Sequence, residues 1–583
     1  MYIYLFFRLT VDEAISLLEE LDNNYDEADI GLGFPEEGMN SDEDSDISDD
    51  DCTGSMNHLG RGVLSATCDV ELRNTNSDEN FDLVQNEDMG SSKKQASKSK
   101  RRKITNWMDK SPSFQVDSKF DKSHVPPKLD SPSDYFELFF DSTLRNIIIE
   151  ETNRYASQKN IQLNFGENEF FVFIGGLMLS GTSPSPNKRR YWSNGDHVPK
   201  ILAKNIRRDR FLQILRNFHF TDNSKIDKTQ TKLLPLFEKL QNNFIEHGYI
   251  PEFSSVDESM VPYYGKHHTK QFIRGKPIRF GFKFWAHCSK KGYLHSFEFY
   301  TRKTDDSAQN YDELGVGGNV VMRLIEKTRC TEERGCKIFF DNFFTSIPLM
   351  NLLTEKEICC MGTARENRLQ KCPLITKKEI SKKPRGFIQS VVSETNLFVQ
   401  KWKDNKDVTL VSNFGSDKVS STQRYDRTIK KYKDVPQPIN FQTYNKHMGY
   451  VDLMDQRIST YRIRMRQRKW WWQIFCYLLS AALNNAFVLM SEHDSKITFL
   501  EFLDSITIKY LNSFGSESLR GKKILPNITL PKRYDQYDHM IIFDEKSGRR
   551  CAQCKVKSKF LCEKCEIGLH PKCFKEWHTK PKH

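Results

Sequence analysis

At about 150 residues per domain, a chain of 583 residues is expected to form roughly four units, and its 38% hydrophobic and 28% charged content is that of a globular protein with polar extensions. The formal net charge at pH 7 is +11 although about the first ninety residues are acidic, so the excess of Lys and Arg lies beyond them and favours a polyanionic partner. Most of the 14 cysteines are scattered singly, which argues against a secreted disulfide scaffold and favours a reducing compartment.

The N-terminal region, residues 1–129, is predicted to be mostly disordered. Its apolar opening, residues 1–7, is far shorter than the roughly 20 residues of a membrane span, so no membrane role is expected, and we interpret it as an extension of an amphipathic helix over 9–21. Residues 36–51 are rich in Asp, Glu and Ser and cannot offset their ordering entropy by burial. The basic cluster 93–103 resembles signals that nuclear import receptors bind, so a nuclear protein is expected; a solvated linker and a phosphate-contacting arm are the alternatives.

Ordered sequence is expected from residue 130. Helical spacing dominates residues 130–252, where the apolar run Phe170–Met178 is a buried helix or strand, and returns from 444 to about 512. We assign 130–252, continued at 458–530, to a mostly helical part of the fold. Short alternating or apolar windows, typical of strands, begin at 253.

These strand-like windows predict an α/β catalytic core, with its first part at 253–365 and its last part at 441–457. Residues 366–440 are basic and contain short strand-like pieces, so they are interpreted as a strand-rich insertion. The chain is therefore expected to be a multidomain protein that ends in a separate cysteine- and histidine-rich module at 548–583.

Four aspartates are candidates for a site with two divalent ions. Such a site assembles carboxylates from different elements, because Mg²⁺ prefers oxygen ligands. Asp257 lies beside a basic segment, Asp341 follows an apolar strand, and Asp452 and Asp455 are three residues apart at the start of a helical pattern, which places both on one side. An Asx turn and helix caps are the structural alternatives.

Two groups of basic residues are candidates for contact with phosphates. The first follows the last aspartates and adjoins three tryptophans, and comprises Arg462, Arg464, Arg466, Arg468, Lys469 and Trp470. Alternate residues do not share a helical face, so part of this group is open to a solvated or salt-bridged role, and the tryptophans to a role in the core. The second group lies beside Asp257 and comprises Lys270, Arg274, Lys276, Arg279 and Lys283.

The C-terminal module contains enough ligands for two tetrahedral Zn²⁺ ions. They occur as four pairs: Cys551 with Cys554, Cys562 with Cys565, His570 with Cys573, and His578 with His583. In a cross-braced arrangement, the first and third pairs bind one ion and the second and fourth bind the other. One zinc ion with spare ligands, or reactive or disulfide-bonded cysteines, are the alternatives. So small a segment is expected to fold only with metal.

Three blocks of sequence, in this order, resemble the signatures of piggyBac-family DNA transposases, most closely the vertebrate-type, transposable-element-derived branch. They are Val256-Asp-Glu-Ser-Met260 with the segment 270–283, Phe339-Phe-Asp-Asn-Phe-Phe-Thr-Ser346, and the segment 444–455 followed by Tyr461, Lys469-Trp470 and Asn485-Ala-Phe487. Related sequence covers most of residues 130–583.

The resemblance implies an RNase H-like core in which Asp257, Asp341 and Asp452 hold Mg²⁺ or Mn²⁺, with Asp455 as a further acidic residue. It also implies Trp470 near the active site, a homodimer, double-stranded DNA as partner, and a zinc domain that recognises transposon ends for cleavage and joining at TTAA targets. The family usually has two glycines before the third aspartate, whereas this chain has Gly449 and Tyr450, which puts turnover in question. A domesticated DNA- or chromatin-binding descendant and a protein-interaction adaptor are the alternative functions.

Overall fold

The computed structural model divides into two compact units, Met1–Gly515 and Ser516–His583. The described residues are 3–10, 27–32 and 67–73, for which only the backbone is considered, and 105–114, 116, 119–120, 126–193, 195, 198–224, 232–249, 251–265, 267, 269–273, 278–301, 311, 313–328, 330, 334–426, 430–467, 469–516, 534, 537–545 and 548–579.

The N-terminal region contains a three-stranded sheet. Its strands are ordered β1-β3-β2 and span Ile3–Thr10 (β1), Glu27–Leu32 (β2) and Thr67–Arg73 (β3). The expectation that the opening residues extend a helix is wrong, because β1 pairs antiparallel with β3 and its β-branched and aromatic residues favour a strand. The remainder of the expected helix, the acidic stretch 36–51 and the basic cluster 93–103 lie outside the described residues.

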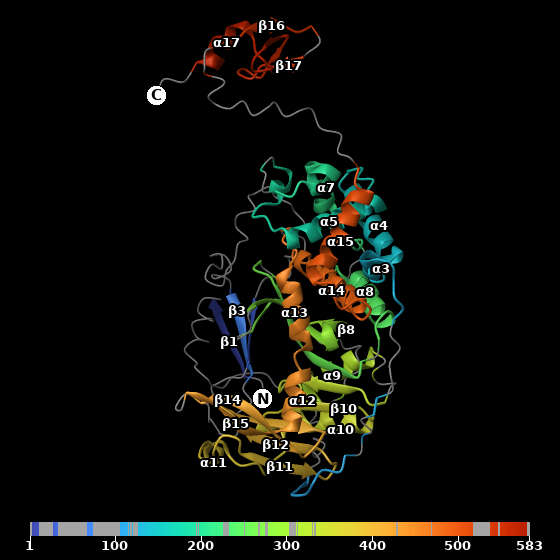
Figure 1. Cartoon of the computed structure of the whole chain (residues 1–583), viewed down its shortest axis with the longest axis vertical. Helices are drawn as coiled ribbons and strands as arrows, with labels where there is room; N and C mark the ends of the chain where they lie inside the picture. Colours follow the sequence, from blue (N-terminus) through green and yellow to red (C-terminus); the bar gives the residue numbers. More distant parts are fainter. Residues whose placement is uncertain are drawn as a thin grey trace, which may run out of the picture. The chain divides into compact units, whose positions relative to one another are not determined.

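A helical layer precedes the main sheet (Figure 1). Its members are α3 (Pro132–Glu137), α4 (Ser142–Gln158), α5 (Glu167–Thr182), η4 (Lys188–Trp192), α6 (Ile201–Asn205), α7 (Arg208–Asn217) and α8 (Leu234–Glu246). The run Phe170–Met178 belongs to α5 and is buried all round. Gly175 of α5 allows close packing of α15, because a Cβ there would lie 3.2 Å from Leu511.

Two later helices complete this layer, α14 (Trp472–Ser491) and α15 (Phe499–Phe514). Helix α14 packs on α3, and α15 packs on α5. Among the described residues, α14 alone is long and apolar enough to cross a membrane, but 89% of its apolar window is buried inside the fold, as in the core helix of a protein that does not span a membrane. The helical layer is therefore built from two segments far apart in the sequence.

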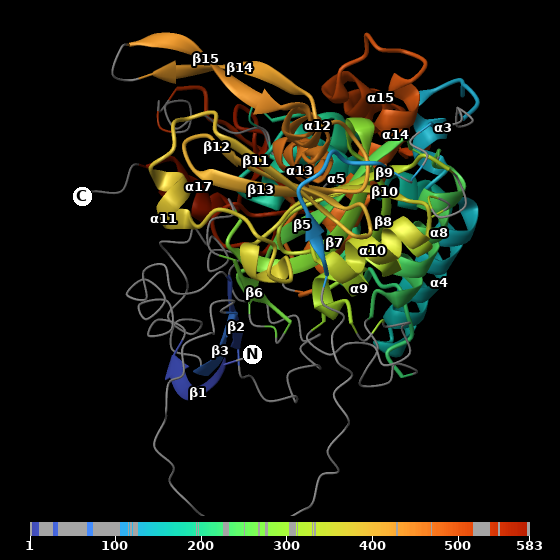
Figure 2. The ribbon, with the colours of Figure 1, turned by 90° about the horizontal axis from the view of Figure 1, so that it is seen from below.

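The centre of the large unit is a ten-stranded mixed sheet (Figure 2). Its first strands are β5 (Phe253–Pro262), β6 (Gln271–Phe272), β7 (Phe280–Ser289), β8 (Tyr293–Phe299), β9 (Lys337–Phe340) and β10 (Cys359–Thr363), with η5 (Lys290–Gly292) before β8. Strand β5 pairs antiparallel with β7 and parallel with β9, which pairs parallel with β10. Helices α9 (Gly315–Glu326) and α10 (Ile347–Glu355) share a hydrophobic core with one face of the sheet.

The insertion between residues 366 and 440 continues this sheet. Its elements are η7 (Glu366–Arg368), α11 (Lys377–Ser381), β11 (Ile388–Ser393), β12 (Phe398–Lys403), β13 (Asp407–Ser412), β14 (Val419–Asp426) and β15 (Lys431–Pro438). Strand β13 joins the insertion to β10, and the short strand β4 (Trp107–Met108) from upstream closes the far edge on β11. Strands β14 and β15 form a separate hairpin.

Helices α12 (Ile439–His447) and α13 (Tyr450–Thr460) lead back across the sheet. Val451 and Met454 of α13 share the large core with Phe284, Ala286 and Cys288 of β7, on the face opposite α9 and α10. Any residue on this face of β5 therefore lies between the sheet and α13.

The described residues of the C-terminal unit form a three-stranded sheet, a hairpin and one helix. They are β16 (Ile541–Phe543), β19 (Phe560–Cys562) and β20 (Ile567–Gly568) in the order β16-β19-β20, the hairpin of β17 (Arg549–Arg550) and β18 (Lys557–Ser558), and α17 (Pro571–His578). Because β16 pairs with β19, this unit begins before the expected boundary at residue 548.

Candidate metal centres and basic surface

Asp257 lies in β5, and Asp341 directly follows the adjacent parallel strand β9. Val256 of β5 is in register with Phe340 of β9, the last residue of that strand, so each aspartate is the residue after a registered pair. Paired positions of neighbouring strands place their side chains on the same face of a sheet. The two carboxylates are therefore brought together from segments 84 residues apart by the register alone, with Asp257 buried and Asp341 half-buried.

Local hydrogen bonds orient these two side chains. Oδ1 of Asp257 accepts from the backbone N–H of Glu258 at 2.8 Å, and Oδ1 of Asp341 accepts from that of Phe343 at 2.8 Å. The latter bond is the Asx turn expected as the structural alternative for Asp341, and it directs the carboxylate out of the strand end. An Asx turn and a metal-binding role are thus compatible, since the turn uses one of two carboxylate oxygens.

The phenol of Tyr444 lies within the field of both carboxylates. Burial is the main reason that the pKa of Tyr444 is raised far above its usual value of 10, and the charges of Asp341 and Asp257 raise it further. Its hydroxyl oxygen lies 3.4 Å from the carbonyl oxygen of Phe340, the residue before Asp341. The negative charge of β5 and β9 therefore converges at this end of the sheet.

Helix α13 contributes the other two aspartates. Asp455 accepts a 2.6 Å hydrogen bond from the hydroxyl of Ser259, which lies two residues after Asp257 on the same face of β5. Burial, followed by the charges of Asp455 and Asp257, raises the pKa of the Cys288 thiol. Asp452 is exposed and lies one helical turn before Asp455. Within the described residues, no three of these aspartates have ligand atoms that all lie within 4.8 Å of one another, so the structure does not bring them into one compact ligand group.

Tyr450, which departs from the family pattern, is seated in the core. Its side chain is 8% exposed, and its hydroxyl lies 2.5 Å from Nδ1 of His447. Burial is the main cause that raises the pKa of Tyr450 to about 12. Gly449 has a φ of −81°, and Tyr450 is the first residue of α13 and is not among the residues with positive φ, so neither position needs the conformational freedom of glycine. The tyrosine is therefore accommodated away from the aspartates rather than between them.

The basic segment after α13 is extended, not helical. Ile463 and Met465 are buried, whereas Arg464 and Arg466 between and beyond them are exposed. In an extended chain alternate residues share a face, so the expectation based on helical spacing is wrong here, and the two arginines project to the same side. Arg468 lies outside the described residues.

Arg462 and Trp470, at either end of the extended segment, are both half-buried. Arg462 is half-buried and lines a partly open hollow with Asp455 and Tyr477. Burial is the main cause that lowers the pKa of this arginine below its ordinary value. Trp470 is half-buried and its ring centroid is 4.2 Å from that of His267. Trp471 and Trp472 are buried, which matches the core role stated as their alternative.

Three of the proposed phosphate contacts are buried instead. Lys469 donates to the carbonyl oxygens of Arg216, at 2.7 Å, and Phe218, so it ties the extended segment to α7. Lys270 is 1% exposed, and burial lowers its pKa to about 8. Lys283 is 3% exposed, with Nζ 3.9 Å from the ring centroid of Trp285.

These lysines bury their charge against carbonyl dipoles and aromatic faces, which sequence periodicity does not reveal. Of the second group, Arg279 is exposed, while Arg274 and Lys276 lie outside the described residues.

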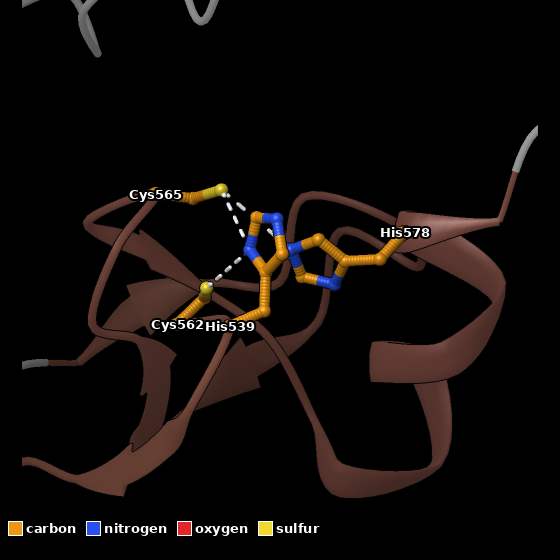
Figure 3. A group of neighbouring side chains, drawn as sticks. All are labelled: His539, Cys562, Cys565 and His578. Carbon is orange, nitrogen blue, oxygen red and sulfur yellow. Dashed lines mark hydrogen bonds between the residues drawn. The ribbon is translucent and has the colours of Figure 1, made fainter. Parts of the chain in front are cut away.

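Two groups of four cysteine and histidine side chains occupy the C-terminal unit, each with all ligand atoms within 4.8 Å of one another. The first is Cys551, Cys554, His570 and Cys573, and the second is His539, Cys562, Cys565 and His578. Figure 3 shows the second group, where Nδ1 of His539 lies 3.4 Å from the sulfur atoms of Cys562 and Cys565. The first and third sequence pairs therefore meet as a cross-brace requires.

His539 was missed in the sequence, because it precedes the module boundary placed at 548. His583, predicted in its place, lies outside the described residues. His539 lies two residues before Ile541, the first residue of β16, which is in register with Cys562 of β19, so strand pairing brings it to the second group and spacing in the sequence does not.

Hydrogen bonds beyond these groups fix the histidine tautomers that a metal needs. Nδ1 of His578 lies 2.9 Å from the carbonyl oxygen of Phe574 and donates to it, which directs Nε2 to Cys565. In His570 the roles are reversed, with Nε2 at 3.0 Å from the carbonyl oxygen of Lys557 and Nδ1 at 3.3 Å from Cys554. This is the usual outer hydrogen-bond shell of a metal-binding histidine.

The cysteine pKa values also fit a cation. Burial opposes ionisation of Cys551, but backbone N–H groups, chiefly that of Cys554, outweigh it and lower the pKa to about 6. Burial, with the neighbouring Cys554 and Cys551, raises the pKa of Cys573 to about 11. Several thiolates at this spacing repel one another unless a cation lies between them, and nitrogen and sulfur ligands in fours suit Zn²⁺.

Comparison with known proteins identifies the family of the chain. The family model "Transposase IS4" matches residues 131–487. Human PiggyBac transposable element-derived protein 3 is 35% identical over 456 residues, covering 77% of this chain and 76% of that protein. Human PiggyBac transposable element-derived protein 2 is 34% identical over 585 residues, covering 97% and 96%.

A solved structure supports the same fold. The piggyBac transposase in its synaptic complex with hairpin DNA superposes with a TM-score of 0.56 at 20% identity, covering 78% of this chain and all of that one. The extent of the family match and of the two human relatives shows that this chain belongs to the piggyBac transposase family.

Proposed function

We propose that the chain is a DNA transposase that cleaves and joins DNA strands with two divalent metal ions. The observation that carries this proposal is the juxtaposition of Asp257 and Asp341 on adjacent parallel strands, with Asp455 linked to β5 through Ser259. The strand order β8-β7-β5-β9-β10, with β9 and β10 parallel to β5, supports an RNase H-like core.

In this proposal Asp257, Asp341 and Asp452 are the metal ligands, and Asp455 is a further acidic residue. Their oxygen-only donor set fits Mg²⁺ or Mn²⁺. When bound, two such ions would supply activation of the attacking oxygen and stabilisation of the leaving oxygen. The chain itself positions these carboxylates. The register of β5 and β9 aligns Asp257 with Asp341, and helix α13 carries Asp452.

The DNA contacts follow from what remains exposed. Arg464 and Arg466 share one side of the extended segment, and Arg279, directly before β7, is also exposed. These three arginines are therefore the proposed phosphate contacts. The C-terminal unit, with two zinc ions, is proposed to recognise transposon ends, and the target is proposed to be TTAA. A homodimer and nuclear import through the cluster 93–103 complete the proposal.

A second function is a domesticated protein that binds DNA or chromatin without cutting it. Both human relatives are described as transposable element-derived proteins, and among the described residues no three of the aspartates have ligand atoms within 4.8 Å of one another. Both functions use the same exposed arginines and zinc unit, so DNA binding alone does not separate them.

An excision assay separates the two functions. The full-length protein is given a plasmid carrying the terminal inverted repeats that flank its own gene, with Mg²⁺ or Mn²⁺. We expect excision by the wild type and loss of excision in Asp341→Asn. The matched control is Asp504→Asn, the same change at a half-buried aspartate of α15, and it is expected to leave excision normal. Tight binding of the ends without excision by the wild type would overturn the enzymatic function in favour of the binding protein.

A further inference from the structure

A chain of two buried hydroxyl groups connects α14 to Asp455. Tyr477 of α14 donates to the hydroxyl of Ser259 at 2.9 Å, and Ser259 donates to Oδ1 of Asp455 at 2.6 Å. Ser259 is 0% and Tyr477 6% exposed, so water does not readily replace either bond. A hydroxyl–carboxylate distance of 2.6 Å is that of a charge-assisted hydrogen bond, the strong type in proteins.

This network joins the elements that carry three of the aspartates. Ser259 lies two residues after Asp257 on the same face of β5, and Asp455 lies one helical turn after Asp452 on the same side of α13. The hydrogen bond from Ser259 to Asp455 therefore adds a polar tie to the core packing of Val451 and Met454, and together they set the rotation and height of α13 over β5. The position of Asp452 relative to Asp257 depends on that rotation, because Asp452 is exposed and is not clamped by buried packing of its own side chain.

Tyr477 determines the direction of the serine hydroxyl. A lone serine hydroxyl rotates among three staggered positions, and only one of them points its hydrogen at Asp455. Because the Tyr477 hydroxyl occupies an acceptor lone pair of Ser259, the serine hydrogen is left directed at the carboxylate. Replacing Tyr477 by phenylalanine removes the hydroxyl that donates to Ser259 and keeps the buried ring, so this change tests the orientation effect.

We propose that Ser259 and Tyr477 are positioning residues for the metal-binding aspartates, acting through Asp455. The inference rests on the proposed two-metal site and deepens it. Changes at residues that hydrogen-bond directly to metal ligands typically alter metal affinity or activity by roughly 10–100-fold. Ser259 acts one step further out, through Asp455, so effects at the lower end of this range are expected. We therefore expect Tyr477→Phe to weaken metal binding by roughly 10-fold and Ser259→Ala by at least as much, with Ser259→Thr restoring most of the affinity.

Matched controls distinguish positioning from general loss of stability. Ser255→Ala alters a buried serine on the same face of β5, two residues before Asp257, whose hydroxyl makes no hydrogen bond among the described residues. Tyr293→Phe removes a buried tyrosine hydroxyl that donates to the carbonyl oxygen of Phe244 at 2.8 Å, away from the aspartates. Both controls are expected to keep wild-type metal affinity, even if Tyr293→Phe lowers the melting temperature.

The test is a Mn²⁺ titration of the full-length, zinc-loaded protein, with free Mn²⁺ measured by electron paramagnetic resonance and folding checked by the melting temperature. The inference is supported if Tyr477→Phe and Ser259→Ala bind Mn²⁺ more weakly than both controls and Ser259→Thr recovers affinity. It is overturned if these variants bind Mn²⁺ like the wild type while Asp257→Asn binds more weakly. If Asp257→Asn also leaves Mn²⁺ binding unchanged, the proposed metal site fails, and the positioning role fails with it.

Discussion

Replacing His539 tests the ligand assignment of the C-terminal unit, because the structure and the sequence pattern name different fourth ligands for the second zinc ion. A structural zinc ion in a small domain binds with about 10–16 kcal/mol, so one of four ligands contributes about 3–4 kcal/mol. Loss of His539 is thus expected to lower the affinity for the second zinc ion by roughly 10²–10³-fold. His583→Ala is expected to leave it unchanged.

The assay measures zinc per protein by mass spectrometry after dialysis against a chelator of graded strength. The wild type and His583→Ala are predicted to keep two ions, and His539→Ala only one, that of Cys551, Cys554, His570 and Cys573. Cys562→Ser serves as a positive control for loss of the second ion. Retention of two ions by His539→Ala, together with loss of one in His583→Ala, would refute the assignment.

Three further predictions concern the large unit. Arg464→Ala and Arg466→Ala should each lower the slope of log affinity for DNA against log salt by about 1, whereas Lys469→Ala, which loses buried bonds to two carbonyl groups, should lower the melting temperature and leave the slope unchanged. Tyr450→Gly should destabilise the fold by about 3–5 kcal/mol, as large-to-small core changes do, without increasing strand cleavage; a faster enzyme would show that the tyrosine obstructs the site. Burial lowers the pKa of His287 from 6.5 to about 4. Between pH 6.5 and 5 the unfolded chain binds a proton at His287 and the folded chain does not, so the free energy of unfolding falls by about 2 kcal/mol. Melting curves of His287→Phe should lack this part of the pH dependence.

Asp257 and Asp341 could be predicted as site residues from the sequence, because the local strand pattern and the order of the family signatures point to the same residues. The apolar window ending at Phe340 predicts a strand, and an aspartate at its end is the expected place for a ligand. What brings Asp341 beside Asp257 is the parallel register of β5 and β9, which no local pattern encodes. The family signatures supplied that information, since blocks in a fixed order imply a common site.

The basic segment shows where a pattern was misread. Arginines at every second position are typical of an extended chain. Here they lie between two strongly helical stretches, α13 and α14, so the helical spacing of those stretches suggests a helix for the segment as well. The buried positions Ile463 and Met465 complete the period of two. Reading the period residue by residue, rather than extending the neighbouring one, would have predicted the shared side of Arg464 and Arg466.

The burial of charged lysines and the ligand role of His539 could not be predicted from the sequence for a different reason. Lys283 is held by aromatic rings from three separate segments, those of Trp285, Tyr300 and Phe343. His539 joins cysteines more than twenty residues later through the pairing of β16 with β19. In both cases the partner is chosen by tertiary packing, and a lysine or histidine in sequence carries no mark of it.

The most direct measurement of the central claim is anomalous diffraction from crystals of the full-length protein bound to its end DNA and soaked in Mn²⁺. We predict two peaks about 4 Å apart, in contact with the carboxylates of Asp257, Asp341 and Asp452. Peaks elsewhere, or an Asp452 carboxylate turned away from both ions, would contradict the account.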